Sequence, residues 1–283
     1  MTAPETLFGP KILLEGPSGT GKTYALGTLT DWAAARNIPV RVLFVENGLE
    51  SLQGYWIDAG KPIPDNLAWH SMAIKPISLA SLMSAADDVG KLSYEALTKK
   101  VDHNRGANNA FHRILGACAN FHDDRTGKDF GAVDTWGADV VFAIDSLSEL
   151  SNACMKMVIG NKPTAAPPDY GVAQNNLMNF LRLITQGCRP IFAMTAHVDR
   201  DKDEVSGTTR VMTKSIGKAL YGDIPPLFSD VIYTVREADK FYWDTAAYGV
   251  DTKTRSLGYR SKIDPNFALI LDKWEARNKG GAA

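Results

Sequence analysis

The segment from Gly16 to Thr23 constrains the fold more than any other feature of this chain. It matches the pattern G-x-x-x-x-G-K-[ST], in which a glycine-rich turn lets successive backbone N–H groups curl around a phosphate chain. Lys22 adds a positive charge next to the terminal phosphates, and the Thr23 hydroxyl can ligate Mg²⁺. The residues predicted to bind a nucleotide are Gly16, Pro17, Ser18, Gly19, Thr20, Gly21, Lys22, Thr23 and Tyr24.

The segments on either side of this loop have the order that the motif requires. The apolar run Ile12-Leu13-Leu14 predicts a short strand, and helix formers follow from Thr23 to Ala35. A Gly-Ser-Gly stretch can also be an ordinary turn, but such a turn has no need of a lysine and a threonine at the next helix start. The order of strand, loop and helix therefore favours a nucleoside triphosphate site.

The composition excludes several classes of protein. The chain has 31 basic and 32 acidic residues, so it is not a globally basic nucleic-acid coat protein, although a local basic groove is allowed. Cys118, Cys154 and Cys188 are widely spaced and form no C-x-x-C pair, which indicates buried thiols in a reducing compartment. No apolar stretch is long enough to span a bilayer, so we expect a soluble, cytoplasmic protein with no membrane partner.

Periodicity and turn signals predict the order of elements. Strands are expected at 12–14, 40–45, 140–144 and 191–194, and again near the C-terminus at 231–235, 241–243 and 268–271, while 67–72 is a short apolar piece. Helices are expected at 79–86, 110–118, 150–159 and 172–184, with loops at 122–134 and 162–169. We therefore predict an α/β fold with a mostly parallel central sheet, flanking helices and C-terminal antiparallel strands. One domain should cover 1–283, with a helical insertion at about 74–136.

Asp145 is the best candidate for the acidic residue that holds Mg²⁺. It ends the apolar run from Val140 to Ile144, which is typical of a central parallel strand covered on both faces. A carboxylate at this position can hold the metal directly or through water, together with Thr23. The alternative is a helix N-cap, which Ser146 can supply with Glu149 in a capping-box spacing. Both interpretations can hold at once.

Glu46 is the candidate for the carboxylate that orients the attacking water. It follows the strand predicted at 40–45, which should lie next to the phosphate loop. Glu50 is close in sequence and is a rival for this role. The alternative for Glu46 is a solvated acidic residue at the start of a loop.

His197 and Thr195 end the strand predicted at 191–194, where a side chain faces the nucleotide in many α/β sheets. Either can sense the terminal phosphate or contact a partner, although a lone histidine is more often structural. The polar segment 199–218 is either a solvated mobile loop or a loop that binds single-stranded nucleic acid through its phosphates. The aromatic residues 241–243 are more typical of hairpin packing than of base stacking.

These residues resemble the RecA-like P-loop ATPases of the AAA/ASCE superfamily, particularly the small phage-encoded proteins of single-strand annealing and recombination. Val45-Glu46-Asn47-Gly48-Leu49 is similar to the family's catalytic glutamate segment, and Ile144-Asp145-Ser146 to its magnesium-binding strand end. The resemblance implies DNA-binding loops at about 160–171 and 198–214, separated by the helix 172–184. It covers most of the chain and implies a location in the host cytoplasm if the protein is phage-encoded.

The same resemblance implies that ATP is bound between subunits of a ring or filament. Lys253-Thr254-Arg255 is similar to a Lys-x-Arg pair that reaches the nucleotide of the neighbouring subunit, so Lys253 and Arg255 are candidate catalytic residues. One departure is Thr195-Ala196-His197, where bacterial RecA has Asn-Gln. This difference bears on strand exchange more than on ATP hydrolysis.

The leading hypothesis is a Mg²⁺-dependent ATPase that acts on single-stranded DNA in phage-type recombination, annealing or replication. Lys22, Thr23, Asp145 and Glu46 would carry the chemistry. The alternative is an ATPase that remodels or assembles a protein partner without binding DNA, which the near-neutral charge slightly favours. A small-molecule kinase fits less well, because no compact arginine cluster is present to form a lid.

Overall fold

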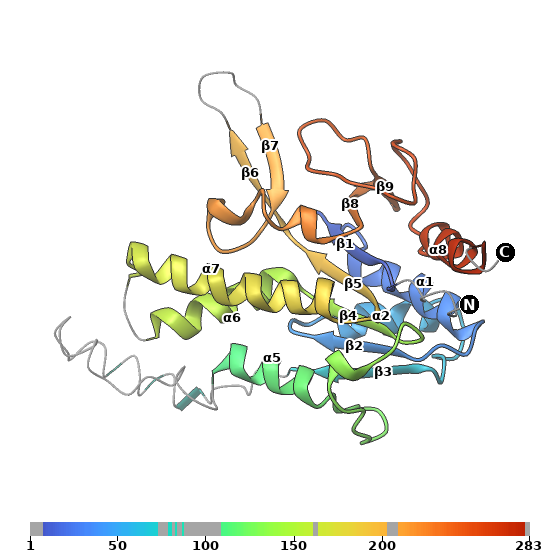
Figure 1. Ribbon diagram of the computed structural model, residues 1–283, viewed down its shortest axis with the longest axis horizontal. Coiled ribbons are helices and arrows are strands. Elements are labelled where there is room, and N and C mark those ends of the chain that lie inside the picture. Colours follow the sequence, from blue (N-terminus) through green and yellow to red (C-terminus); the bar gives the residue numbers. More distant parts are fainter. Residues whose placement is uncertain are drawn as a thin grey trace, which may run out of the picture.

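A seven-stranded sheet lies at the centre of the described part of the chain, in the order β3-β2-β4-β5-β1-β8-β9 (Figure 1). The strands are β3 (Leu67–Ser71), β2 (Val40–Phe44), β4 (Val141–Asp145), β5 (Ile191–Ala196), β1 (Lys11–Glu15), β8 (Asp230–Glu237) and β9 (Lys240–Asp244). Neighbouring strands are parallel except for the antiparallel pair β8–β9. The predicted fold class, a mostly parallel α/β sheet with antiparallel strands toward the C-terminus, is confirmed.

The computed structural model describes residues 8–72, 79–80, 83, 87, 109–160, 164–202 and 209–280. The helix predicted at 79–86 falls largely outside these residues, as does the first part of the insertion predicted at about 74–136. The single domain predicted over 1–283 stays a prediction.

Helices cover both faces of the sheet. One layer consists of α1 (Lys22–Ala34), α2 (Leu49–Ile57) and α8 (Ala268–Gly280), and the other of α5 (Ala110–Ala119), α6 (Leu147–Ile159) and α7 (Pro167–Arg182). Consecutive residues of a strand point to opposite faces, so Leu13 packs with the second layer while Ile12 and Leu14 pack with the first. All three are 0% exposed, which explains why β1 is apolar throughout its centre.

Parallel pairing brings the ends of four strands to one edge of the sheet. In the register, Glu15 of β1 lies opposite Ala196 of β5, and Phe44 of β2 lies opposite Asp145 of β4. The residues that follow these strands therefore meet at the same edge, where ligands bind in open α/β sheets.

The segment predicted as a polar loop at 122–134 covers the outer edge of the sheet. Asp123 Oδ1 accepts a hydrogen bond from the Trp69 backbone N–H at 3.1 Å, and Asp124 Oδ2 accepts one from the Ser71 N–H at 2.7 Å. These carboxylates pair the free N–H groups of β3, so the segment protects an edge strand from pairing with another chain.

The strand predicted at 268–271 is wrong, because these residues begin α8. Asn266 Oδ1 accepts a hydrogen bond from the Ala268 N–H at 2.9 Å, as a side chain at a helix start does. Ile270 and Leu271 are 0% exposed against the first layer. A short apolar run has no periodicity that distinguishes a strand from the first turn of a helix.

The loop predicted at 162–169 is shorter than expected, because α7 begins at Pro167. Proline suits the first helical position, where its missing N–H would have no intrahelical partner. Asp169 Oδ2 accepts a hydrogen bond from the Ala166 N–H at 2.8 Å and so closes the first turn. The end of the candidate DNA-binding segment 160–171 is therefore helical.

The polar segment 199–218 contains an antiparallel hairpin of β6 (Val198–Lys202) and β7 (Thr209–Thr213). The hairpin follows β5 directly and projects away from the sheet (Figure 1). Its base is closed by a hydrogen bond from the Lys214 N–H to the His197 carbonyl at 2.8 Å. The expectation of a loop is wrong for the described part. The charged residues of this segment indicate a solvated loop, but backbone hydrogen bonds between β6 and β7 order it.

The carboxyl group of Glu15 is buried beneath this hairpin and is 0% exposed. Its Oε2 accepts a hydrogen bond from Thr213 Oγ1, and its Oε1 has no partner among the described residues. Burial raises the pKa of Glu15 from its ordinary value of 4.5 to about 7. The folded chain therefore holds a proton that the unfolded chain releases, and its unfolding free energy falls as the pH rises through this range.

Replacing Glu15 with Gln is expected to remove this pH dependence. The stability of the variant relative to the wild type should rise by roughly 1 to 3 kcal/mol between about pH 5 and about pH 8. Urea unfolding at the two pH values measures this change. Glu237→Gln is the control, because that carboxylate is exposed and its surface ion pair contributes little. An equal effect of Glu15→Gln at both pH values would show that the buried carboxyl does not titrate in this range.

Candidate functional site

The phosphate loop connects β1 to α1 at the edge of the sheet where the strands end. Gly19 and Gly21 have φ values of 73° and 80°, in the left-handed region that favours glycine. A Cβ on Gly21 would lie 2.7 Å from Cγ of Phe241, and one on Gly16 would lie 2.2 Å from Oγ1 of Thr234. The glycines therefore let β8 and β9 approach the loop closely.

Lys22 lies within the curl of this loop and is 6% exposed. Its Nζ donates hydrogen bonds to the carbonyls of Gly16 at 2.8 Å and Pro17 at 2.7 Å. Burial lowers the pKa of Lys22 to about 8, while the nearby carboxylates of Asp145 and Glu46 act in the opposite direction. A phosphate chain would add the negative charge that favours the protonated amine.

Asp145 lies directly beneath the start of α1 and is 1% exposed. Its Oδ2 accepts a hydrogen bond from Thr23 Oγ1 at 2.8 Å, and its Oδ1 accepts one from Thr195 Oγ1. Burial raises the pKa of Asp145 above its ordinary value, and the two hydroxyls oppose that shift. Gly48 makes room for this carboxylate, since a Cβ there would lie 2.2 Å from Oδ2.

Thr23 and Asp145 fit a magnesium ion by their chemistry. Both offer hard oxygen ligands at the mouth of a phosphate-binding turn, and Mg²⁺ usually takes few protein ligands and leaves the others to phosphate and water. The alternative role of a helix N-cap falls to Ser146, which occupies that position before α6. Its side chain makes no capping hydrogen bond, so the expected cap through Ser146 is wrong.

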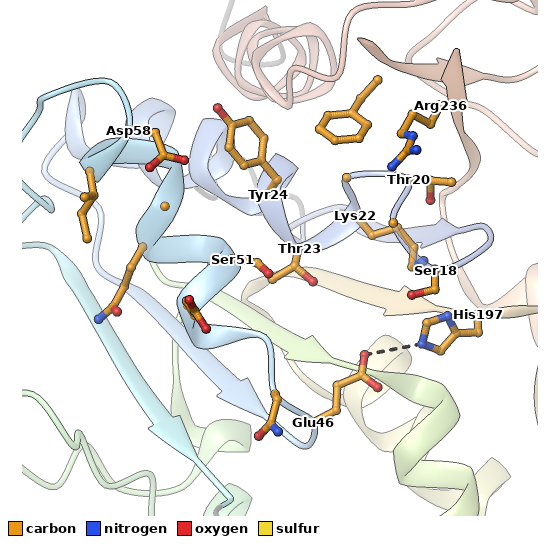
Figure 2. Close-up of a pocket in the computed structure, with 18 residues that line it drawn as sticks. Ser18, Thr20, Lys22, Thr23, Tyr24, Glu46, Ser51, Asp58, His197 and Arg236 are labelled. Atoms are coloured by element: carbon orange, nitrogen blue, oxygen red, sulfur yellow. Dashed lines mark ion pairs between the residues drawn. The ribbon is translucent and has the colours of Figure 1, made fainter. Parts of the chain in front are cut away.

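Glu46 and His197 face each other across the site (Figure 2). Glu46 Oε1 lies 3.7 Å from His197 Nε2, and the two side chains are 27% and 31% exposed. The contact with His197 lowers the pKa of Glu46, although burial acts in the opposite direction. Glu46 is thus a carboxylate at neutral pH, as a group that orients water must be. Glu50 lines the same cavity from α2, so the sequence alternative remains at this point.

A cavity of about 890 Å³ joins these groups. Lys22, Thr23, Glu46 and His197, which the sequence indicates separately, all line it. Tyr24 also lines it, and its ring centroid lies 6.0 Å from that of Phe241 and 5.0 Å from that of Tyr55. The cavity therefore has both charged and aromatic side chains in its lining.

Lys253 and Arg255 do not contact this cavity. Lys253 pairs with Val231 at the start of β8, which lies beside the amino end of β1, whereas the phosphate loop follows the carboxyl end of β1. The Lys253 Nζ donates a hydrogen bond to the Phe228 carbonyl at 2.7 Å. The two residues thus lie outside the cavity of their own chain, and a contact with a neighbouring subunit stays a prediction.

Sequence reasoning missed Arg236 and interpreted Phe241 as hairpin packing, but both residues line the cavity. They come from β8 and β9, more than 200 residues after the phosphate loop. No local motif marks them. Their place in the site follows from the strand order. The phosphate loop follows β1, and β8 is paired with β1, so β8 passes next to this loop.

Two observations limit other interpretations of the described residues. No helix in the described ranges is long and apolar enough to cross a membrane. Of the basic residues on the hairpin, Arg210 forms an ion pair with Asp251 at 2.7 Å, and Lys218 at the hairpin base forms one with Asp201 at 2.6 Å. A polyanion would therefore compete with acidic groups already in place.

Comparison with known proteins agrees with this geometry. The family model described as AAA domain matches residues 9–260, which includes every strand of the central sheet and all the residues of the cavity. A search of the curated proteins finds no match to the chain.

Proposed function

We propose that this chain, which belongs to the AAA domain family of P-loop ATPases, couples Mg²⁺-dependent ATP hydrolysis to work on single-stranded DNA. The proposal of ATP hydrolysis rests on one observation. A single cavity is lined by Lys22, Thr23, Glu46 and His197, and Asp145 lies beneath it, hydrogen-bonded to Thr23. The resemblance to RecA-like proteins of phage recombination and annealing supports the DNA-directed role. Assembly into a ring or filament is part of the same proposal.

Each residue has a distinct task in this reaction. Backbone N–H groups of the phosphate loop and Lys22 Nζ bind the phosphate oxygens and stabilise the charge that develops on them. Thr23 and Asp145 would hold Mg²⁺, which neutralises charge between the terminal phosphates when it is bound. Glu46 accepts a hydrogen bond from the attacking water and orients it toward the terminal phosphorus.

His197 connects this chemistry to the hairpin of β6 and β7. Its imidazole contacts Glu46, while its backbone carbonyl accepts the hydrogen bond from Lys214 that closes the hairpin base. A change at the terminal phosphate can therefore alter the hairpin through one residue. This connection supports the view that the hairpin is the part of the chain that contacts the partner.

The helix α7, which begins within the first segment proposed to bind DNA, contacts the chain just after the second segment. Gln174 Nε2 of α7 donates a hydrogen bond to the Ile216 carbonyl at 2.9 Å, which ties α7 to the chain just after the hairpin. Arg200, Lys202 and Lys214 offer positive charge on or beside the hairpin. Such a surface is suited to phosphate contacts of moderate strength.

The ATPase rate is expected to rise several-fold when single-stranded DNA is added, and sizing should show assembly on the DNA. Binding to a labelled oligonucleotide should weaken steeply with salt, because each phosphate contact releases a counterion. Lys202→Ala should reduce the salt dependence, whereas Lys279→Ala on α8, remote from the hairpin, should leave it unchanged. If single-stranded DNA neither raised the ATPase rate nor bound to the protein, the proposal that the protein acts on DNA would be wrong.

A second candidate is an ATPase that remodels or assembles a protein partner. The ion pairs Arg210–Asp251 and Lys218–Asp201 favour it, since they neutralise part of the positive charge on and beside the hairpin. In that case the hairpin would contact a polypeptide. ATPase activity that DNA does not stimulate, together with salt-independent partner binding, would support this alternative.

A further inference from the structure

The β8–β9 hairpin places a guanidinium group over the phosphate loop. Alternate residues of a strand share a face, so Thr234 and Arg236 of β8 both point toward this loop. Thr234 Oγ1 is hydrogen-bonded to Thr20 Oγ1 at 2.7 Å, which fixes β8 against the loop. Nη1 of Arg236 lies 3.8 Å from the position that a Cβ on Gly19 would take. Figure 2 shows the side chain directed toward the loop.

Arg236 has no other partner in the described part of the chain that would account for its position. Among the residues that the structure describes, no hydrogen bond or ion pair holds its guanidinium there, whereas the next residue, Glu237, forms an ion pair with Lys262 at 2.7 Å. The cross-strand neighbour of Arg236 is Phe241, which packs against Gly21. The hairpin is therefore held in place without the charge of Arg236, and that charge is available to a ligand.

We propose that Arg236 is a catalytic residue that contacts the triphosphate bound by its own chain and stabilises the charge that develops during cleavage. This inference rests on the proposed ATPase activity. A guanidinium offers a planar fork of donors that matches phosphate oxygens, and an arginine supplied in this way can raise the hydrolysis rate greatly. Lys22 also lines the cavity, so a bound polyphosphate would contact two cationic side chains, Lys22 and Arg236.

The step itself is a hydrolysis that needs no further reactant. The oxygen of the attacking water forms a bond to the γ-phosphorus while the bond from that phosphorus to the bridging oxygen breaks. The electron pair of the broken bond passes to the β-phosphate, and a proton of the water passes to Glu46. Arg236 donates hydrogen bonds to the phosphate oxygens and forms or breaks no covalent bond, so its effect is on the transition state.

The geometry also fixes which subunit supplies the arginine. Arg236 and Gly19 belong to one chain, and Nη1 of Arg236 lies 3.8 Å from the position of a Cβ on Gly19, because β8 is paired directly with β1. An assembled ring or filament is therefore not required to complete this part of the site. This distinguishes Arg236 from Lys253 and Arg255, which do not line the cavity of their own chain.

The test compares Arg236→Ala and Arg236→Lys with the wild type. We expect Arg236→Ala to lower kcat roughly 100-fold or more and to weaken binding of a non-hydrolysable ATP analogue by less than about 10-fold. Arg236→Lys should recover little of the rate, since an ammonium lacks the planar fork. Lys240→Ala, on the same hairpin and exposed outside the cavity, is the matched control and should keep the wild-type rate.

A mixing experiment tests the assignment to one chain. Arg236→Ala keeps an intact phosphate loop, and Lys22→Ala keeps an intact Arg236, so a mixture recovers activity only if the arginine acts across subunits. We expect no recovery, and recovery would overturn the inference. A rate for Arg236→Ala within about twofold of an active wild type would also overturn it while leaving the proposed function intact. An inactive wild type would instead overturn the proposed function and this inference together.

Discussion

Replacing Lys22 with Ala is expected to weaken ATP binding by roughly 100-fold and to reduce hydrolysis below detection. The Lys22 amine is buried within the loop and donates hydrogen bonds to the carbonyls of Gly16 and Pro17. Its loss removes a charge-assisted hydrogen bond to the phosphates and leaves two carbonyls facing a polyanion. Calorimetry with a non-hydrolysable analogue measures the binding, and phosphate release measures the rate.

Lys240→Ala is the control for this experiment, because it removes an exposed lysine at the start of β9 without changing the cavity. Thermal unfolding of both variants tests whether the fold is kept. Wild-type affinity in the Lys22→Ala protein would show that the nucleotide binds elsewhere, and the assignment of the phosphate loop would then be wrong.

Replacing Glu46 with Gln is expected to lower kcat by roughly 100- to 10,000-fold while ATP remains bound. The amide keeps the size of the side chain and can still contact His197, but it cannot accept a proton from water. The contact with His197 lowers the pKa of the wild-type carboxyl group, against the effect of burial, so the group is ionised at neutral pH. A single-turnover measurement with labelled ATP separates binding from cleavage in this variant.

Glu50→Gln distinguishes between the two acidic residues that line the cavity. Glu50 lies in the first turn of α2, whereas the carboxylate that contacts His197 is that of Glu46, so replacement of Glu50 should change kcat by less than about 10-fold. If Glu50→Gln abolishes cleavage while Glu46→Gln does not, the two roles are reversed. Normal hydrolysis in both variants would remove a carboxylate base from the mechanism.

The physical basis of this site is the convergence of strand ends. β1, β2, β4 and β5 are parallel, so residues that are far apart in sequence follow the same edge and share one cavity. The surroundings of each ionisable group then shift its pKa. Burial raises the pKa of Asp145 and lowers that of Lys22, while His197 lowers that of Glu46. The result is an ionised carboxylate in the cavity beside a cationic loop.

Predictions from local patterns succeeded where the pattern was complete within a few residues. The motif from Gly16 to Thr23 and the apolar run from Val140 to Ile144 specify their strand, loop and helix boundaries almost alone. Patterns that depend on distant partners failed. Residues 268–271 form a helix because they are capped and packed against α1, and 199–218 contains a hairpin because its two halves pair with each other.

The sequence by itself determined the phosphate loop, the candidate catalytic carboxylates Asp145 and Glu46, and the α/β class, because each depends on residue type and on short-range order. The tertiary structure alone decided that Arg236 and Phe241 face the phosphate loop and that Lys253 and Arg255 do not. The reason is that strand order brings β8 beside β1, and hydrogen bonding between strands so distant in sequence is a property of the folded chain.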